Sequence, residues 1–198
     1  MQQILDVMSA GDLLAIGLFF VSWLTFEIIT DHTNHKNSSL SGLMAHKRRE
    51  WLLVMVERDL RIVDTSIMAG LQQGTAFFAS SAILAIGGCF ALLGSTDLVS
   101  GIYQDLPLDA KFSRGLFELK VLGLALIFVY SFFKFGWAFR LFNYCSILVG
   151  AVQQPNEAPL EDRRTQALRA ADMNIIASRH FTAGLRGIFF ALGYLGWF

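Results

Sequence analysis

The sequence predicts an all-α, polytopic transmembrane helical bundle with four spans and long cytoplasmic helix extensions, on three observations. Hydrophobic residues make up 54% of the 198 residues, and 18 of them are Phe. The run from Thr65 to Thr96 carries no charge and is long enough to cross a bilayer as a helix. The segment before it is basic, and Lys and Arg accumulate on the cytoplasmic side of membrane proteins. These features favour one integral membrane domain over residues 1–198 and give no sign of nucleic-acid binding.

The first span is predicted over residues 13–29, where Glu27 is the sole charge. Asp6 and Asp12 precede this stretch without any Lys or Arg, whereas the cations follow it. The N-terminus is therefore expected outside the cell, without a cleaved signal segment.

A cytoplasmic amphipathic helix is predicted over residues 43–68 and a second span over 74–94. No Pro interrupts them, so the two can form one rod of roughly 75 Å at the helical rise per residue. A bend at Gly70 or Gly74 is the alternative.

Small residues recur along the second span. They let another backbone approach closely, which favours helix packing. The predicted packing residues are Gly74, Ser80, Ser81, Gly87 and Gly88.

A third span is predicted over 115–134, with its helix continuing towards Val152. A second cytoplasmic helix follows over 159–179 and leads into a fourth span over 181–198. The basic residues support this topology, because only Lys111 and Arg114 fall in the predicted outer loop. The expectation is a multi-pass protein of the bacterial inner membrane, with both termini outside and the basic loops cytoplasmic.

Several sequence blocks resemble the bacterial integral membrane proteins of domain of unknown function family 599. The blocks are RREW, RIVD, FFASSAILAIGG with ALLG, FFKFGWAFRLFNY with ILVGA, and RHFTAGLR. The resemblance implies a multispanning helical protein without an assigned activity, and it supplies no active-site residues.

Ionisable residues within or beside spans are candidates for function, because a charge in hydrocarbon needs water or a partner. The candidates are Glu27, Lys134 and Arg186. Arg186 is the strongest, since it can pair with Glu27 or bind a lipid phosphate. Snorkelling to the membrane surface is the alternative for Glu27 and Lys134.

Basic and aromatic residues beside the membrane are candidates for contact with lipid headgroups or a partner. They are Lys47, Arg48, Arg49, Trp51 and Arg140. For the cluster around Trp51, a purely topological role is the equal alternative.

Asp31, His32 and His35 are weak candidates for metal ligands, and a solvated polar loop is the favoured interpretation. No cofactor is predicted, and no nucleophile motif, phosphate-binding Gly-rich loop or pair of catalytic carboxylates is found.

The leading functional hypothesis is a non-catalytic membrane protein that assembles with itself or with other membrane subunits, in a scaffold or accessory role, and contacts membrane lipids. A homo-oligomeric channel or transporter for an ion or small solute is the alternative. A lipid-modifying enzyme is third, and it would require a cytoplasmic pocket that gathers His180, Asp64 and arginines.

Overall fold

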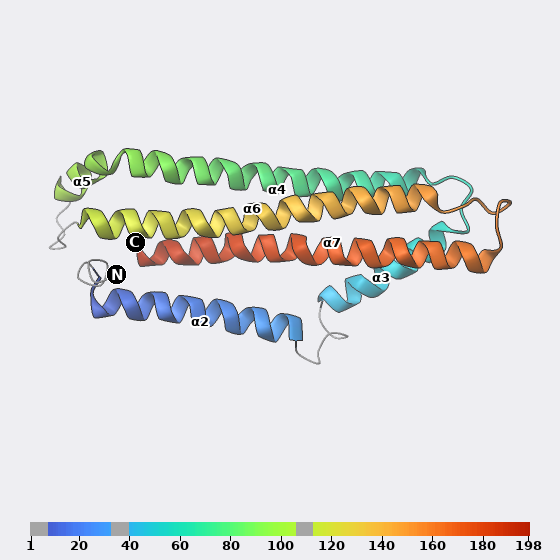
Figure 1. Ribbon diagram of the computed structural model, residues 1–198, viewed down its shortest axis with the longest axis horizontal. Helices are drawn as coiled ribbons and strands as arrows, with labels where there is room; N and C mark the ends of the chain where they lie inside the picture. The colour runs from blue at the N-terminus through green and yellow to red at the C-terminus, as the bar shows by residue number, and fades with distance from the viewer. Residues whose placement is uncertain (1–7, 33–39, 106–112) are drawn as a thin grey trace.

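The computed structural model is all-α and describes residues 8–32, 40–105 and 113–198. The helices of these residues, in chain order, are α2 (Ala10–His32), α3 (Leu40–Met55), α4 (Ile62–Gly94), α5 (Thr96–Asp105), α6 (Arg114–Ala151) and α7 (Leu160–Tyr194), followed by the short 3₁₀ turn η2 (Leu195–Trp197). Helices α4, α6 and α7 run the length of the molecule side by side, with α6 antiparallel to both neighbours (Figure 1). Helices α2 and α3 lie one after the other along α7.

This arrangement builds two stacked hydrophobic cores from the same three long helices. Residues of α3 complete the core at one end, where Leu52 and Met55 are fully buried beside Phe142 of α6. Side chains of α2 complete the other, where Phe19 and Trp23 pack against a cluster that includes Val121 and Ala191. We call the end with α2 the apolar half and the end with α3 the polar half.

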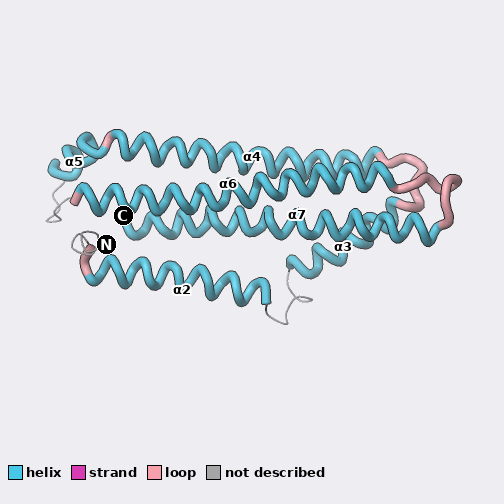
Figure 2. The backbone as a smooth tube through the Cα atoms, viewed as in Figure 1, coloured by secondary structure: helices cyan, strands magenta, loops and turns pink. Residues whose placement is uncertain are grey.

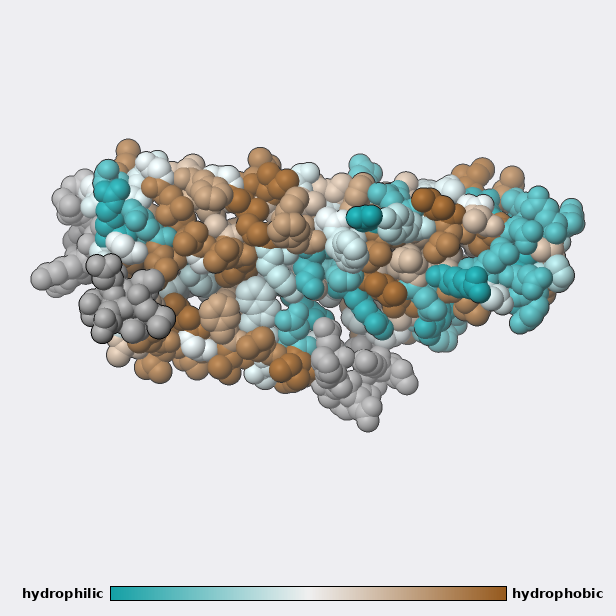
Figure 3. Space-filling view, in the orientation of Figure 1, coloured by the Kyte–Doolittle hydropathy of each residue, from teal (hydrophilic) through white to brown (hydrophobic). Residues whose placement is uncertain are grey.

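The surface of the molecule changes character between the two halves. Hydrophobic side chains dominate the face of the apolar half, and hydrophilic ones gather over the polar half (Figure 3). Three helices are long and apolar enough to cross a membrane, namely α2 over Ala10–Thr30, α4 and α6. The apolar helices indicate a membrane-embedded helical protein. Among the described residues, α7, which contains most of the fourth predicted span over 181–198, is not one of these three candidates.

The single rod predicted from residue 43 through the second span is wrong. Helix α3 ends at Met55, and α4 begins at Ile62 after a reversal of direction that Figure 2 shows as a loop at the end of the molecule. No Gly or Pro marks this break; tertiary contacts hold it instead. Arg163 Nη1 of α7 donates to the Val56 carbonyl oxygen at 2.8 Å, and Arg58 Nη1 lies 2.8 Å from Asp64 Oδ1.

Arg61, the last residue of this turn, caps the neighbouring helix α6. Its guanidinium donates to the carbonyl oxygens of Val152 at 2.5 Å and Gln153 at 3.0 Å. Carbonyls at the end of a helix lack partners within the helix and carry partial negative charge, so a cation here is favourable. The turn is thus fixed to both α6 and α7.

The closest helix contact lies between α6 and α7, where glycine is required. A Cβ placed on Gly184 of α7 would lie 2.7 Å from the ring of Phe135, and one on Gly187 would lie 2.2 Å from Ser131 Oγ. Sequence analysis did not select this contact. The signal was present, because small residues recur along one face of α7: Ala167, Ala170, Ala171, Ala177, Gly184, Gly187 and Ala191.

The small residues predicted to pack on α4 do not do so inside the chain. A Cβ on Gly74, Gly87 or Gly88 would meet no other atom within 4 Å. Ser80 is exposed, and Ser81 Oγ donates to the Phe77 carbonyl oxygen of its own helix at 2.9 Å. The role of these residues in helix packing therefore stays a prediction, since Ser80, Gly87 and Gly88 are exposed and open to a partner outside this chain.

Candidate functional site

A cavity of the described residues lies where the two halves meet, between the end of α2, the start of α3 and the middle of α7. Its volume is about 540 Å³, a size typical of small-molecule sites. Its lining is polar and basic, with Arg48 and Arg49 from α3 and Arg179 and Arg186 from α7. The other lining residues are Thr30, Leu40, Ser41, Gly42, Met44, Ala45, His46, Ile175, Ser178 and Thr182.

The two arginines from α3 lean on α7 but differ in their electrostatic balance. Arg49 Nη2 forms an ion pair with Asp172 Oδ1 at 2.8 Å. Arg48 Nη1 donates to the amide oxygen of the buried Asn174, which is neutral. Burial lowers the pKa of Arg48, although an arginine remains charged at neutral pH. The charge of Arg48 is therefore not neutralised by its partner.

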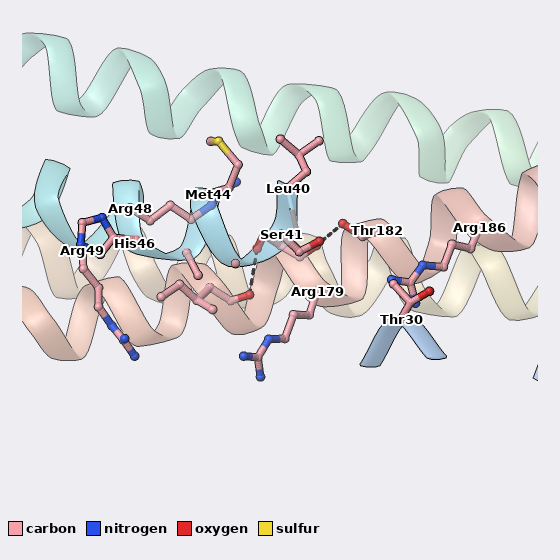
Figure 4. A pocket seen from close by; sticks show the side chains of 14 residues that line it. Thr30, Leu40, Ser41, Met44, His46, Arg48, Arg49, Arg179, Thr182 and Arg186 are labelled. Carbon is pink, nitrogen blue, oxygen red and sulfur yellow. Dashed lines mark hydrogen bonds between the residues drawn. The ribbon is translucent and has the colours of Figure 1, made fainter. Parts of the chain in front are cut away.

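The two arginines from α7 face the cavity two helical turns apart. In Figure 4 the guanidinium of Arg179 projects to the same side as that of Arg49, while Arg186 reaches towards Thr30 at the end of α2. Arg179 is exposed and has no ion pair among the described residues. The guanidinium of Arg186 lies 5.7 Å from the centroid of the Phe26 ring, within the range of a cation–π contact.

Two hydroxyl groups of α7 also line the cavity, those of Ser178 and Thr182. Thr182 Oγ1 donates to the Ser178 carbonyl oxygen at 2.9 Å, and Ser178 Oγ donates to that of Ile175 at 2.8 Å. These bonds fix both oxygens toward the backbone and leave their lone pairs as acceptors. Sequence analysis found Arg48, Arg49 and Arg186 but missed Arg179, Ser178 and Thr182. The spacing of Arg179, Thr182 and Arg186 on one helical face was the signal that could have found them.

Three of the residues predicted to meet headgroups or a partner do not line the cavity. Lys47 Nζ pairs with Glu50 at 2.6 Å, and hydrogen bonding from Lys47 lowers the pKa of the Glu50 carboxyl. Trp51 Nε1 donates to Asp64 Oδ1 at 2.7 Å, inside the junction of α3 and α4. Arg140 lies on the exposed side of α6, with its Nε 2.7 Å from the hydroxyl oxygen of Tyr144.

The other ionisable candidates meet at Tyr130 of α6. The Tyr130 hydroxyl donates to Glu27 Oε1 at 3.3 Å, and Lys134 Nζ lies 5.2 Å from the centroid of the same ring. A single aromatic residue therefore connects the charge near the end of α2 with the charge on α6. The pairing of Arg186 with Glu27 stays a prediction.

The metal hypothesis falls at the edge of the described chain. His35 lies outside the described residues, and so do the side chains of Asp31 and His32. The pocket required by the enzyme hypothesis does not form as expected. Asp64 is buried in the junction of α3 and α4, His180 lies against Trp137, and neither lines the arginine cavity.

A family model described as "Protein of unknown function, DUF599" matches residues 14–198 of the chain. This match confirms the resemblance predicted from the sequence blocks. No curated protein and no solved structure matches the chain.

Proposed function

We propose, on the premise that the chain belongs to the DUF599 family, that it is a non-catalytic, four-span inner-membrane protein that assembles with a second copy through α4. The family description assigns no activity, so the proposal rests on the surfaces of this chain. The observation that carries it is the uncovered, small-residue face of α4: 11% of the residues in its most apolar stretch are buried, against 0% in α2 and 28% in α6.

The exposed face of α4 has the composition of a helix contact. Gly87 and Gly88 are open to the surface, and the exposed Ser80 lies two turns before Gly87. Small residues let two membrane helices approach closely. The resulting van der Waals contacts drive helix association in lipid, where the hydrophobic effect does not. The same chain already uses glycine in this way between α6 and α7. In a two-fold symmetric dimer the same surface of both copies meets, so the small-residue face of α4 would pack against α4 of the second copy.

Self-assembly is tested by the mass of the purified protein in mild detergent, read by native mass spectrometry. The unaltered chain should be a dimer, and Gly87→Leu should shift it at least tenfold toward monomer, because leucine separates the backbones. Gly17→Leu is the matched control, since Gly17 of α2 is also open and should leave the dimer intact. A monomeric unaltered chain would overturn the proposal. A stoichiometric foreign subunit released by Gly87→Leu would make the occupant another membrane protein.

In the orientation that we propose, the polar half and its cations face the cytoplasm and α5 lies outside the cell. It is supported by the bias of Lys and Arg toward that half and by the C-terminal part of α7, where Arg186 is the only charge within 181–198. This part runs alongside the candidate spans, which supports the proposed fourth crossing (Figure 1).

Cysteine labelling of intact spheroplasts tests this orientation. His46→Cys on α3 should resist a membrane-impermeant maleimide, and Ser95→Cys beside α5 should react. The native Cys89 and Cys145 are buried and should stay silent. Lysed membranes give the control in which both introduced thiols react. Labelling of His46→Cys in intact spheroplasts would reverse the topology.

A channel or transporter is the second candidate, and the contacts of Tyr130 with Glu27 and Lys134 favour it. Such a path would be built from several copies around these side chains. Ion flux into vesicles that contain the purified oligomer distinguishes it from a scaffold. A lipid-modifying enzyme has less support, because His180 and Asp64 do not share the arginine cavity.

A further inference from the structure

We propose that the cavity between α2, α3 and α7 binds a phosphate-bearing anion, held by Arg179 and Arg186 with Arg48 and Arg49 on the opposite wall. The first reason is charge. No Asp or Glu is among the described residues that line the cavity, which holds four arginines. Asp172 pairs with Arg49, and the described residues that line the cavity together carry a net positive charge.

The second reason is that Arg179 makes no hydrogen bond or ion pair among the described residues that would explain a guanidinium at this position. Arg48 and Arg49 connect α3 to Asn174 and Asp172 on α7. Arg179 has no such partner among the described residues, and it lies one turn beyond Asn174 and Ile175 on a face that α3 leaves open. The guanidinium of Arg179 lies beside an open cavity that Arg48 and Arg49 of α3 also line, and such a group can bind an anion.

The third reason is the fit to phosphate. Arginine presents paired N–H donors that match two phosphate oxygens. Arg179 and Arg186 are separated by roughly 10 Å along the helix axis at the helical rise per residue. That distance suits one phosphate with substituents, or two phosphates, within a cavity of about 540 Å³.

The position of the cavity offers two sources for this phosphate. Thr30 lies near the end of a candidate span, and Arg186 rests over Phe26 of the same span, so the cavity opens at the level of the headgroups. An anionic phospholipid can enter from the membrane, and a soluble phosphate compound can enter from the aqueous side. Binding of a lipid from the membrane depends on the proposed orientation, whereas the anion site itself does not. Neither the site nor the lipid source depends on the α4 dimer.

Two probes distinguish the sources. Lipid binding is measured by native mass spectrometry of the protein transferred from nanodiscs that contain phosphatidylglycerol and phosphatidylcholine. Soluble binding is measured with inorganic pyrophosphate, by its stabilisation of the protein in a neutral detergent. We expect saturable binding of at least one probe by the unaltered chain. Competition of phosphatidylglycerol with pyrophosphate would show that both reach one site.

The variants Arg179→Gln and Arg186→Gln should each weaken that binding by roughly 10-fold or more, since each removes a charge-assisted contact. The lysine variants Arg179→Lys and Arg186→Lys should lose less, because they keep the charge but not the paired donors. Arg169→Gln is the matched control, an exposed arginine of α7 that does not line the cavity, and it should bind as the unaltered chain does. Circular dichroism without probe verifies that each variant is folded.

The proposal is overturned if folded Arg179→Gln and Arg186→Gln bind both probes as the unaltered chain does. It is also overturned if Arg169→Gln weakens binding equally, which would mean general attraction to a basic surface. Binding of pyrophosphate alone would assign a soluble ligand, and binding of phosphatidylglycerol alone would assign a lipid. A monomeric protein that still binds would leave this site intact while removing the proposed assembly through α4.

Discussion

Gly184→Ala should lower the stability of the protein by about 1–3 kcal/mol, the usual cost of forcing an extra methyl group into a packed interior. The added carbon would lie 2.7 Å from the ring of Phe135, which is fully buried and packed against the rings of Phe78 and Phe181. Thermal unfolding in detergent, followed by circular dichroism, measures the effect. For a chain of this size a loss of 1 kcal/mol lowers the melting temperature by roughly 2–4 °C.

Gly87→Ala is the control for Gly184→Ala, and its effect should have the opposite sign. No atom lies within 4 Å of a Cβ at Gly87, and alanine is a better helix former than glycine by roughly 0.5–1 kcal/mol. The melting temperature of the monomer should therefore stay the same or rise slightly. Equal destabilisation by both variants would contradict the close contact of α6 with α7.

Arg58→Ala should destabilise the polar half more strongly, by roughly 3 kcal/mol, because it leaves the buried carboxylate of Asp64 without its ion partner. Asp64 is fully buried, and its Oδ2 has no hydrogen-bond partner among the described residues. Arg58 is 38% exposed, so water already screens part of the pair and the lower end of the known range applies. A loss of this size lowers the melting temperature by roughly 6–12 °C.

A double variant separates the charge effect from a general loss of packing. Asp64→Asn in the Arg58→Ala background removes the unpaired charge while its amide oxygen can still accept from Trp51 Nε1. It should recover a large part of the lost stability. A double variant as unstable as Arg58→Ala alone would show that the ion pair is not the cause.

The long helices were predictable because their signals are local and strong. Pro159, with Glu161 and Asp162 after it, marks the start of α7, which begins at Leu160 as expected. The mostly apolar sequence after Arg114, which contains no Pro, likewise forms one helix as far as Ala151. Such patterns depend on neighbouring residues, which a sequence displays directly.

The turn between α3 and α4 could not be predicted in the same way. Its residues are ordinary helix formers. The helix stops because Arg163, which is distant in sequence, binds the Val56 carbonyl oxygen, and because the buried Asp64 binds Arg58. The cavity depends on that reversal, because it lays α3 along α7 and brings Arg48 beside Arg179. Sequence analysis therefore identified most of its arginines but not the site that they form.

The placement of α2 has a consequence for the order in which the protein is made. Its aromatic contacts are with late parts of the chain: Trp23 stacks on Phe190 at 5.0 Å, and Phe19 meets the ring of Tyr194 at 5.3 Å. At ordinary rates of synthesis the ribosome needs on the order of ten seconds or more to reach these residues. Until then α2 can contact Tyr130 of α6, which is made earlier, and lipid can surround the rest of its apolar surface. Of the described helices, α2 is synthesised first and is among the last to be secured, and it closes the bundle when the end of α7 arrives.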